Sequence, residues 1–452
     1  MRCATVAMCS TRGVLSWRAV PTSCAVSRKR LRRPICLATT IRGRMHRPKP
    51  KRKMMKIVTP KPLFLLPLLL LFLLSGCGDG DQMAQAPDDS IKLMFIGQIT
   101  DTANATPLPE AADGVRAAVA AINAGGGLNG RPLTLEICDD RADANEATKC
   151  ARRAAREGIV ATVGNSSNFG NVILPVLEQA GIASIGHNPI SPQDFSSPVA
   201  FPLQGGSPGM VAGAANMLAD QGASRIRIAA VDSPAGASSE AFAKAGLVGT
   251  DSEFAGITLV PIGAPDYAIY AQSIFQDSDG VLIGMNADQA ARMITALRQA
   301  DPDKPIAVTM AALPPATIEQ LGQAAEGILV STPFRPITAG GETIEKFLAG
   351  MAKTAPNARI NGFSLQGWLA VQTFSRAMES LPVEQISAQS VLTRMNSLNQ
   401  LSVGDALAPL TTTDEYKPPF NRLFNRKVLF GVVRNGEIRL VDEDWHQVSL
   451  VH

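Results

Sequence analysis

The feature that most limits the fold of this chain is a regular alternation of short apolar runs with helix-period segments, beginning at Ile91. Runs such as 91–99 (IKLMFIGQI) and 225–232 (RIRIAAVD) have strand character. The segment 109–127 carries apolar residues at helical spacing and ends in three glycines, which stop a helix. Continuous apolar strands separated by helices are typical of parallel sheets with helices on both faces. We therefore predict an α/β fold.

The alternation continues over about 360 residues, too many for one hydrophobic core, so two lobes are expected. Asp143 and Glu146 have the spacing of a capping box, which predicts a helix from there to Arg156. Asn435-Gly436 between two apolar runs predicts a β-hairpin near the C-terminus. Further helices are predicted from about 171 and over 208–221, 238–248, 266–276, 287–300, 315–324, 342–354, 361–380 and 384–397.

A second apolar segment, 63–74, follows several lysines and has the character of a secretory signal. Spanning a bilayer needs about 20 apolar residues, so this run is too short for a transmembrane helix. The sequence Leu74-Ser75-Gly76-Cys77 resembles the lipobox of bacterial lipoproteins. That resemblance implies that 54–76 is a signal peptide and that Cys77 becomes acylated at the mature N-terminus, anchored to the membrane. The alternative is a coincidental cysteine after an ordinary signal peptide.

The flanks of this segment differ sharply in charge. Residues 1–61 contain 17 of the 43 Lys and Arg and none of the 39 Asp and Glu, so the remainder of the chain is acidic. Without a basic stripe in the body of the protein, nucleic-acid binding is not expected. We interpret 1–53 as an unstructured basic leader or a misassigned start, with Met54 or Met55 as the natural start, and 77–90 as a solvated linker to the lipid anchor.

Two cysteines, Cys138 and Cys150, follow Cys77. Cysteine pairs outside the cytoplasm tend to oxidise, so we predict a disulfide between them. Closing so short a loop would stabilise the fold by roughly 3 kcal/mol on the loop-entropy model. Two buried free thiols are the alternative.

Polar residues cluster where predicted strands end, and this is where α/β sheets bind ligands, because backbone N–H groups and helix dipoles point there. The segment 163–170 (VGNSSNFG) is the most informative, since four hydrogen-bonding side chains in a row exceed what one helix cap needs. Ordinary helix capping is the alternative for every such residue. The candidate ligand-binding residues are Asn165, Ser166, Ser167, Asn168, His187, Asn188, Gln98 and Asp101 in the first lobe, and Asp232 and Asn286 in the second.

Signatures of enzymes are missing from the sequence. It has no P-loop, nucleophile elbow, Cys-x-x-Cys or Gly-x-Gly-x-x-Gly after a strand, and its few histidines are too sparse for a His-rich metal site. The glycines at 125–127 follow a helix and form a turn. We therefore expect neither catalysis nor a cofactor or metal.

The segments 114–186, 265–300 and 324–331 resemble type I periplasmic binding proteins, of the leucine/isoleucine/valine-binding type that serves ABC importers. The resemblance covers about 91–440. It implies two Rossmann-like lobes with parallel sheets, joined by three crossover strands and closing on a small solute. Lobe 1 would comprise 91–203 and 333–403, and lobe 2 would comprise 204–332 and 404–452. An ABC permease would be the partner of a protein expected to be monomeric.

The ligand positions of that family are only partly matched. Its serine pair after the third strand corresponds to Ser166 and Ser167, whereas the Ala-x-Thr pattern usual after the fourth strand is missing from 188–190. In the second lobe, 232–239 lacks the tyrosine that often holds an amine, and alanines stand at 311 and 312 in place of an acidic residue. Burying an ammonium group without a partner is costly, so an amide, a carboxylic acid or another small polar metabolite is as well supported as an amino acid.

The sequence therefore predicts a lipid-anchored, extracytoplasmic solute-binding protein of an ABC importer, on the periplasmic face where a second membrane exists. A ligand-sensing or partner-binding lipoprotein of the same fold, without a transport role, is the main alternative. An extracytoplasmic hydrolase and a purely structural envelope lipoprotein are further alternatives.

Overall fold

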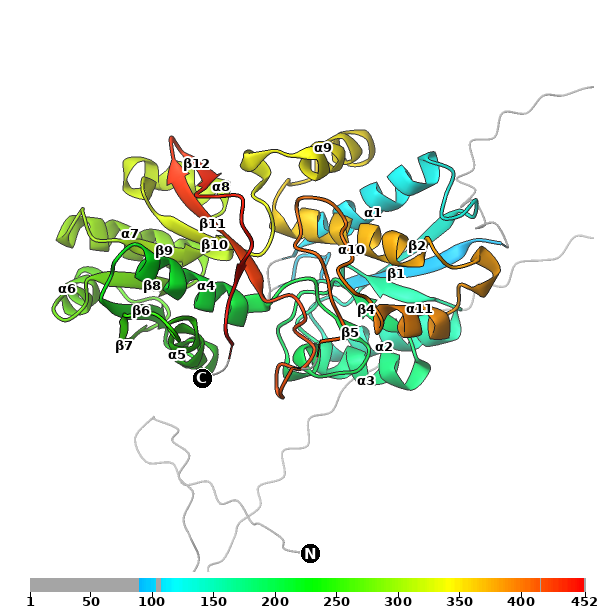
Figure 1. Ribbon diagram of the computed structural model, residues 1–452, viewed down its shortest axis with the longest axis horizontal. Coiled ribbons are helices and arrows are strands. Elements are labelled where there is room, and N and C mark those ends of the chain that lie inside the picture. Colours follow the sequence, from blue (N-terminus) through cyan, green and yellow to red (C-terminus); the bar gives the residue numbers. More distant parts are fainter. Residues whose placement is uncertain (1–88, 103–106, 415, 451–452) are drawn as a thin grey trace, which may run out of the picture. The chain divides into compact units, whose positions relative to one another are not determined.

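The computed structural model describes residues 89–102, 107–414 and 416–450 (Figure 1). The predicted leader, signal peptide and lipobox, with Cys77, lie outside these residues. No helix in the described ranges is both long enough and apolar enough to cross a membrane.

The strands and helices alternate as predicted. The strands are β1 (Ile91–Gly97), β2 (Leu133–Asp139), β3 (Ala161–Val163), β4 (Ala183–Ile185), β5 (Ala200–Phe201), β6 (Arg225–Val231), β7 (Glu253–Val260), β8 (Gly280–Gly284), β9 (Ile306–Thr309), β10 (Leu329–Thr332), β11 (Lys427–Arg434), β12 (Glu437–Leu440) and β13 (His446–Gln447). The α-helices are α1 (Pro109–Ala124), α2 (Ala144–Arg156), α3 (Gly170–Ala180), α4 (Gly206–Asp220), α5 (Pro234–Gly246), α6 (Ala268–Phe275), α7 (Ala287–Ala300), α8 (Pro315–Leu321), α9 (Glu342–Thr354), α10 (Gly362–Met378) and α11 (Ala388–Met395). Short 3₁₀ helices are η1 (Pro192–Phe195), η2 (Met310–Ala312), η3 (Gly322–Ala325), η4 (Ile337–Ala339) and η5 (Val383–Gln385).

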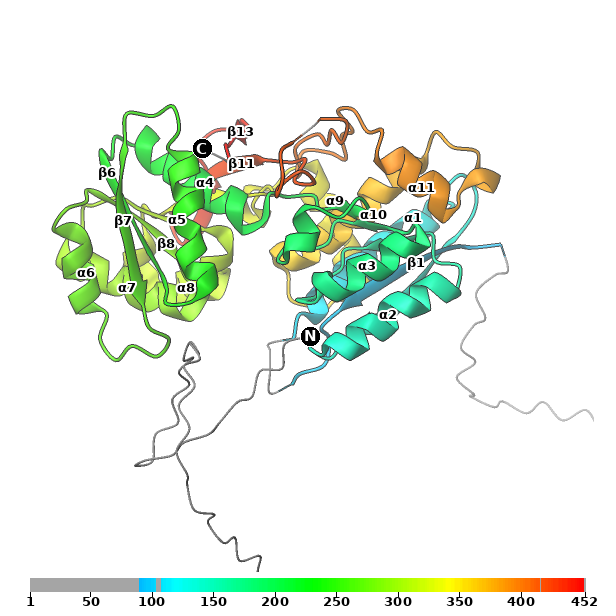
Figure 2. The ribbon, with the colours of Figure 1, turned by 90° about the horizontal axis from the view of Figure 1, so that it is seen from below.

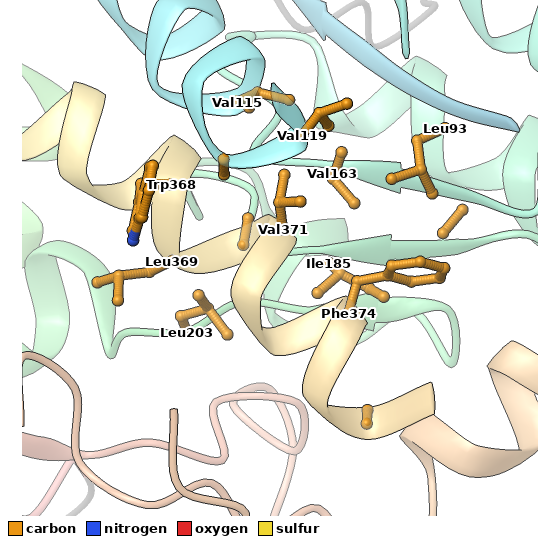
Figure 3. Close-up of a cluster of buried hydrophobic side chains, with 14 of the residues drawn as sticks. Leu93, Val115, Val119, Val163, Ile185, Leu203, Trp368, Leu369, Val371 and Phe374 are labelled. Carbon is orange, nitrogen blue, oxygen red and sulfur yellow. The ribbon is translucent and has the colours of Figure 1, made fainter. Parts of the chain in front are cut away.

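The first sheet is parallel and has the strand order β2-β1-β3-β4-β5. Successive side chains of a strand point to opposite faces, so Leu93 and Phe95 of β1 enter one core and Met94 and Ile96 enter another. Helices α1, α9, α10 and α11 cover the first face, which Figure 3 shows with Val115 of α1 and Phe374 of α10 beside the strands. Helices α2 and α3 lie side by side over the other face (Figure 2). Helices therefore shield both faces of the sheet from water, as continuous apolar strands require.

The second sheet has the order β12-β11-β10-β9-β8-β6-β7, with β13 paired to β11. Strands β6 to β10 pair in parallel, and β11 and β12 add an antiparallel edge. Helices α6, α7 and α8 pack on one face, and α4 and α5 pack on the other. The hairpin predicted at Asn435-Gly436 joins β11 to β12, and both residues have the positive φ that such a turn demands.

In its described part, the chain passes between the two sheets three times. It leaves the first sheet after β5 and enters α4, it returns after β10, and it crosses again just before β11. The last crossing was expected at 404. The structure places it between Phe424 and Lys427, because Leu410 pairs with Leu401 and both Leu410 and Phe424 are buried in the first core.

Local signals explain where several elements begin. The Asp143 carboxylate accepts hydrogen bonds from the N–H groups of Asn145 and Glu146 and caps α2, so the predicted start of this helix holds through the aspartate half of the capping box. Helix α5 begins at Pro234, four residues before the predicted start, because Ser233 caps it and proline is favoured at the first helical position. Helix α11 is shorter than the predicted 384–397, since a separate 3₁₀ turn precedes it.

The predicted disulfide joins Cys138 at the end of β2 to Cys150 in α2, with 5.7 Å between the Cα atoms. It therefore links an edge strand to the helix that covers it. Both cysteines are buried.

Candidate functional site

The strand order identifies two places where a ligand is expected. In the first sheet, β2 lies on one side of β1 and β3 on the other, so the connections leaving β1 and β3 diverge. In the second sheet the same reversal falls between β6 and β8. Ligands of doubly wound sheets bind outside the carboxyl ends of the strands at such points. Gln98 and Ser166 follow β1 and β3, and Asp232 and Asn286 follow β6 and β8.

Gln98 and Ser166 are joined by their backbones. The Gln98 N–H donates to the Ser166 carbonyl at 3.1 Å, and the Ser166 N–H donates to the Ile96 carbonyl at 3.0 Å. Both side chains are buried, and within the described residues neither Gln98 Nε2 nor Ser166 Oγ has a hydrogen-bond partner. Buried polar groups are rarely left unpaired, so these two side chains stand out among the polar residues at this edge.

Ser167 and Asp140 form a second polar pair at this edge. Ser167 Oγ accepts from the Phe169 N–H at 3.2 Å, and Asp140 Oδ1 nearby accepts from the Ala142 N–H at 2.9 Å. Asp140 is fully buried, and this burial raises the pKa of its carboxyl. Asn168 and Asp101, also predicted as ligand residues, are exposed.

Asn165 uses its side chain inside the lobe. Its Oδ1 accepts from the Ile96 N–H at 2.8 Å, and its Nδ2 donates to Thr162 Oγ1 at 2.9 Å and Ser184 Oγ at 3.3 Å. These bonds tie the loop after β3 to β1 and β4, so Asn165 supports the site structurally.

His187 is buried beyond the end of β4. Its Nδ1 lies 3.2 Å from Ser184 Oγ, and its Nε2 lies 3.5 Å from Asp194 Oδ1. Burial lowers the pKa of His187, although the Asp194 carboxylate opposes that effect. The neighbouring Asn188 is partly exposed, and its N–H donates to the Asn165 carbonyl at 3.0 Å. His187 is thus an internal residue, and Asn188 is the one closer to solvent.

A small cavity lies among these side chains. It measures about 10 Å³, which is room for about one water molecule and not for a metabolite. Its lining includes Asn165, Ser167, Ser184, His187, Asn188 and Asp194.

The two predicted residues of the second sheet are both exposed. The Asp232 N–H donates to the Val260 carbonyl, which fixes the backbone at the β6 end. Asn286 caps α7, with Oδ1 accepting from the Gln289 N–H at 3.0 Å and Nδ2 donating to Gln289 Oε1 at 2.7 Å. Helix capping, the alternative considered from the sequence, is therefore what the Asn286 side chain does.

A pair of buried glutamines at the first crossing was not predicted. Gln204 Nε2 donates to Gln366 Oε1 at 2.8 Å, and Gln366 Nε2 donates to the Gly186 carbonyl at 2.9 Å. Gln366 lies on α10 and so holds the loop that carries His187 and Asn188. A glutamine in the apolar run SLQGWLAV was the only sequence signal, and its partner is 162 residues away.

The described residues contain no group of three or more His, Cys, Asp or Glu side chains that could hold a metal ion. What the two sheet reversals share is a set of polar side chains at the carboxyl ends of parallel strands. This arrangement defines a class, the two-lobed α/β proteins that bind small solutes.

The comparison with known families makes the assignment specific. The family model described as "Periplasmic binding protein" matches residues 91–435, and the chain belongs to this family. The predicted fold and the predicted membership in the type I periplasmic binding proteins are thereby confirmed. No curated protein sequence matches the chain.

Solved structures show the same fold at low sequence identity. A putative branched-chain amino acid ABC transporter protein from Rhodospirillum rubrum is 20% identical, with a TM-score of 0.64, over 78% of this chain and all of that one. The leucine binding protein LivK from Thermotoga maritima is 17% identical, with a TM-score of 0.58, over 79% and 98%. A fatty acid ABC transporter substrate-binding protein from Thermomonospora curvata is 16% identical, with a TM-score of 0.64, over 81% and 94%.

Proposed function

We propose that this protein is the extracytoplasmic substrate-binding component of an ABC importer, anchored to the membrane through Cys77. Its solute would be small and would carry a carboxylate or amide group, bound between the two lobes. The binding residues would be Gln98, Ser166, Ser167 and Asn188 of the first lobe. No catalytic step is part of this proposal.

The observation that carries the proposal is the pair of unpaired buried donors, Gln98 Nε2 and Ser166 Oγ, at the reversal of the first sheet. An amide N–H₂ group can only donate, and a serine hydroxyl can donate, so together they suit an oxygen acceptor. Helix α3 begins a few residues beyond Ser166, and its dipole adds a partial positive charge on that side. A carboxylate oxygen could accept hydrogen bonds from both donors, and its negative charge would be stabilised by the dipole of α3.

The named ligands of the structural neighbours agree with a carboxylate. Branched-chain amino acids, leucine and fatty acids all carry one, whereas fatty acids carry no ammonium group. The alanines at 311 and 312 offer no charge to an ammonium group. We therefore place carboxylic acids and amides ahead of the common amino acids as solutes.

A ligand screen tests the proposal directly. The purified protein is heated in the presence of carboxylic acids, their primary amides, branched-chain amino acids and uncharged controls, and the unfolding temperature is recorded. A ligand present at about 100 times its Kd stabilises the folded state by about 2.7 kcal/mol, which a thermal shift resolves easily. If broad metabolite pools give no shift, the proposal is contradicted.

Two single substitutions locate the site. Ser166→Ala and Ser167→Ala should each weaken binding of the identified solute by about tenfold, the value of one hydrogen bond to a charged group. Ser397→Ala, at an exposed position after α11, is the matched control and should bind as the wild type does. Titration calorimetry measures the affinity of all three variants for the solute. Wild-type affinity in both Ser166→Ala and Ser167→Ala would show that these serines do not bind it.

A sensor or partner-binding lipoprotein without transport is the second candidate. The missing ammonium partner at positions 311 and 312 favours it, because it departs from the amino-acid importers of the same type. Deleting the gene and measuring uptake of the identified solute separates the two: lost uptake supports transport, and unchanged uptake supports sensing.

A further inference from the structure

A series of buried hydrogen bonds crosses the carboxyl edge of the first sheet. The donor and the acceptor of each bond can be assigned from its neighbours. It begins at the Ile96 N–H, which can only donate. The side-chain atom of Asn165 at 2.8 Å from it must therefore be the oxygen, and this fixes the orientation of the amide. Asn165 Nδ2 then necessarily donates, and Ser184 Oγ at 3.3 Å is one of its acceptors.

Ser184 links Asn165 to His187 by accepting one hydrogen bond and donating the next. Since its hydroxyl oxygen accepts from Asn165, its own hydrogen is free to point toward His187 Nδ1 at 3.2 Å. All three side chains are at most 4% exposed, so bulk water does not compete for these bonds.

One contact opposes this direction. The Ser184 carbonyl oxygen also lies 3.2 Å from His187 Nδ1, and it would favour a proton on that nitrogen. A neutral ring with Nδ1–H would, however, turn the lone pair of Nε2 toward Asp194 Oδ1 at 3.5 Å. Two acceptors facing each other in a buried site are costly, so the proton belongs on Nε2.

Asp194 faces the end of the series. Its Oδ1 lies 3.5 Å from His187 Nε2, which has no hydrogen-bond partner within the described residues. Its Oδ2 accepts from the N–H groups of Ile190 and Ser191 at 3.1 and 2.6 Å. The loop from Gly186 to Asp194 is thus held through His187 at one end and through its own backbone at the other.

We infer that Asn165, Ser184 and His187 form one directional hydrogen-bond chain, which together with the facing Asp194 side chain fixes His187 as its Nε2–H tautomer and so positions the Asn188 loop. His187 is then a positioning residue, acting on the solute through Asn188. This last step rests on the proposed function, whereas the tautomer follows from the bonds alone.

Catalysis is not the role of these residues, although serine, histidine and aspartate occur in sequence. Ser184 is 1% exposed, and its hydroxyl hydrogen is already used by the ring. No substrate atom can approach the hydroxyl without opening the core of the lobe.

The tautomer can be measured directly. In the purified protein labelled with ¹⁵N-histidine, the two ring nitrogens of each histidine have distinct chemical shifts, and His187→Gln identifies the resonances that belong to His187. We expect a protonated Nε2 and an unprotonated Nδ1 at neutral pH. A protonated Nδ1 with a bare Nε2, or an imidazolium, would overturn the inference.

A single substitution tests the link to Ser184. In Ser184→Ala the hydroxyl that donates to Nδ1 is gone, whereas Asp194 still faces Nε2. Nε2 should therefore keep its proton, and only the Nδ1 signal should shift, because that nitrogen loses its hydrogen-bond donor. Ser331→Ala removes another fully buried serine hydroxyl, from the second sheet, and should leave the spectrum of His187 unchanged. An unchanged Nδ1 signal in Ser184→Ala contradicts the chain.

The effect on binding separates this inference from the proposed function. Ser184→Ala should weaken solute binding about fivefold, the value of about one hydrogen bond, while Ser331→Ala should not. Wild-type affinity in Ser184→Ala would refute the positioning role. If no solute binds even the wild type, the proposed function fails, but the tautomer result still stands on its own.

Discussion

At the scale of single residues, the buried polar groups of the first sheet fall into two kinds. Asn165 and Ser184 are fully occupied by neighbours, whereas Gln98 Nε2 and Ser166 Oγ have no hydrogen-bond partner in the described ranges. Leaving a buried donor unpaired costs about 1–3 kcal/mol. In the proposed function, a ligand that accepts from both donors would recover this cost.

His187 should make stability depend on pH. A histidine in the unfolded chain titrates near 6.5, and burial lowers the pKa of His187 despite the nearby Asp194 carboxylate, while Arg422 adds to the lowering. Between the two pKa values the unfolded chain binds more protons than the folded one, so the free energy of unfolding falls as the pH drops below 6.5.

Urea unfolding at several values between about pH 7.5 and pH 5.5 measures this dependence. His187→Gln should be clearly less sensitive to pH than the wild type over that range. Equal slopes for the two proteins would show that His187 is not the group responsible.

At the scale of elements, α1 and α10 make the tightest helix contact over the first sheet. A Cβ added at Gly114 of α1 would lie 1.9 Å from the Ser364 carbonyl oxygen of α10, and one added at Gly367 would lie 2.3 Å from the Ala111 carbonyl oxygen. Glycine at these positions lets the two backbones touch.

Gly114→Ala should therefore lower the free energy of unfolding by about 1–3 kcal/mol through overpacking. Gly209→Ala in α4 is the matched control, because no atom lies within 4 Å of the added Cβ there, and it should be neutral or stabilising by about 0.5–1 kcal/mol. Chemical denaturation of both variants measures the difference, and equal stabilities would contradict the packing argument.

The elements themselves could largely be predicted because their signals are local. The apolar runs, the Asp143 cap and the Asn435-Gly436 turn each lie within a few residues of the structure they produce. The cysteine pair was predictable because it was the only pair left after Cys77. The start of α5 was predicted four residues too late, because the cap signal of Ser233-Pro234 was not used.

The candidate site was less predictable because its interactions are long-range. The sequence pointed to Ser166 and Gln98, but it could not show that their side chains are left unpaired. It also could not show that Asn165 and His187 face inward, or that Gln366 reaches the Gly186 carbonyl from 180 residues away. Such facts depend on which strands become neighbours, and nothing local encodes that.

At the scale of the whole molecule, the proposed anchor is testable without knowing the solute. Cys77→Ser should move the protein from the membrane fraction to the soluble extracytoplasmic fraction, because a single substitution removes every acyl chain. Serine substitution of Cys138 and Cys150 together is the control and should leave the protein with the membrane. A Cys77→Ser protein that stays membrane-bound would contradict lipid anchoring.

The three passages between the sheets also govern the order in which the lobes can form during biosynthesis. Helix α1 covers part of one face of the first sheet, but α9, α10 and α11, which cover the rest, leave the ribosome well after β1 to β5. Until these helices are synthesised, apolar side chains on that face are exposed to water, and the nascent segment can aggregate. We therefore expect the first lobe to be completed only after translation of α10.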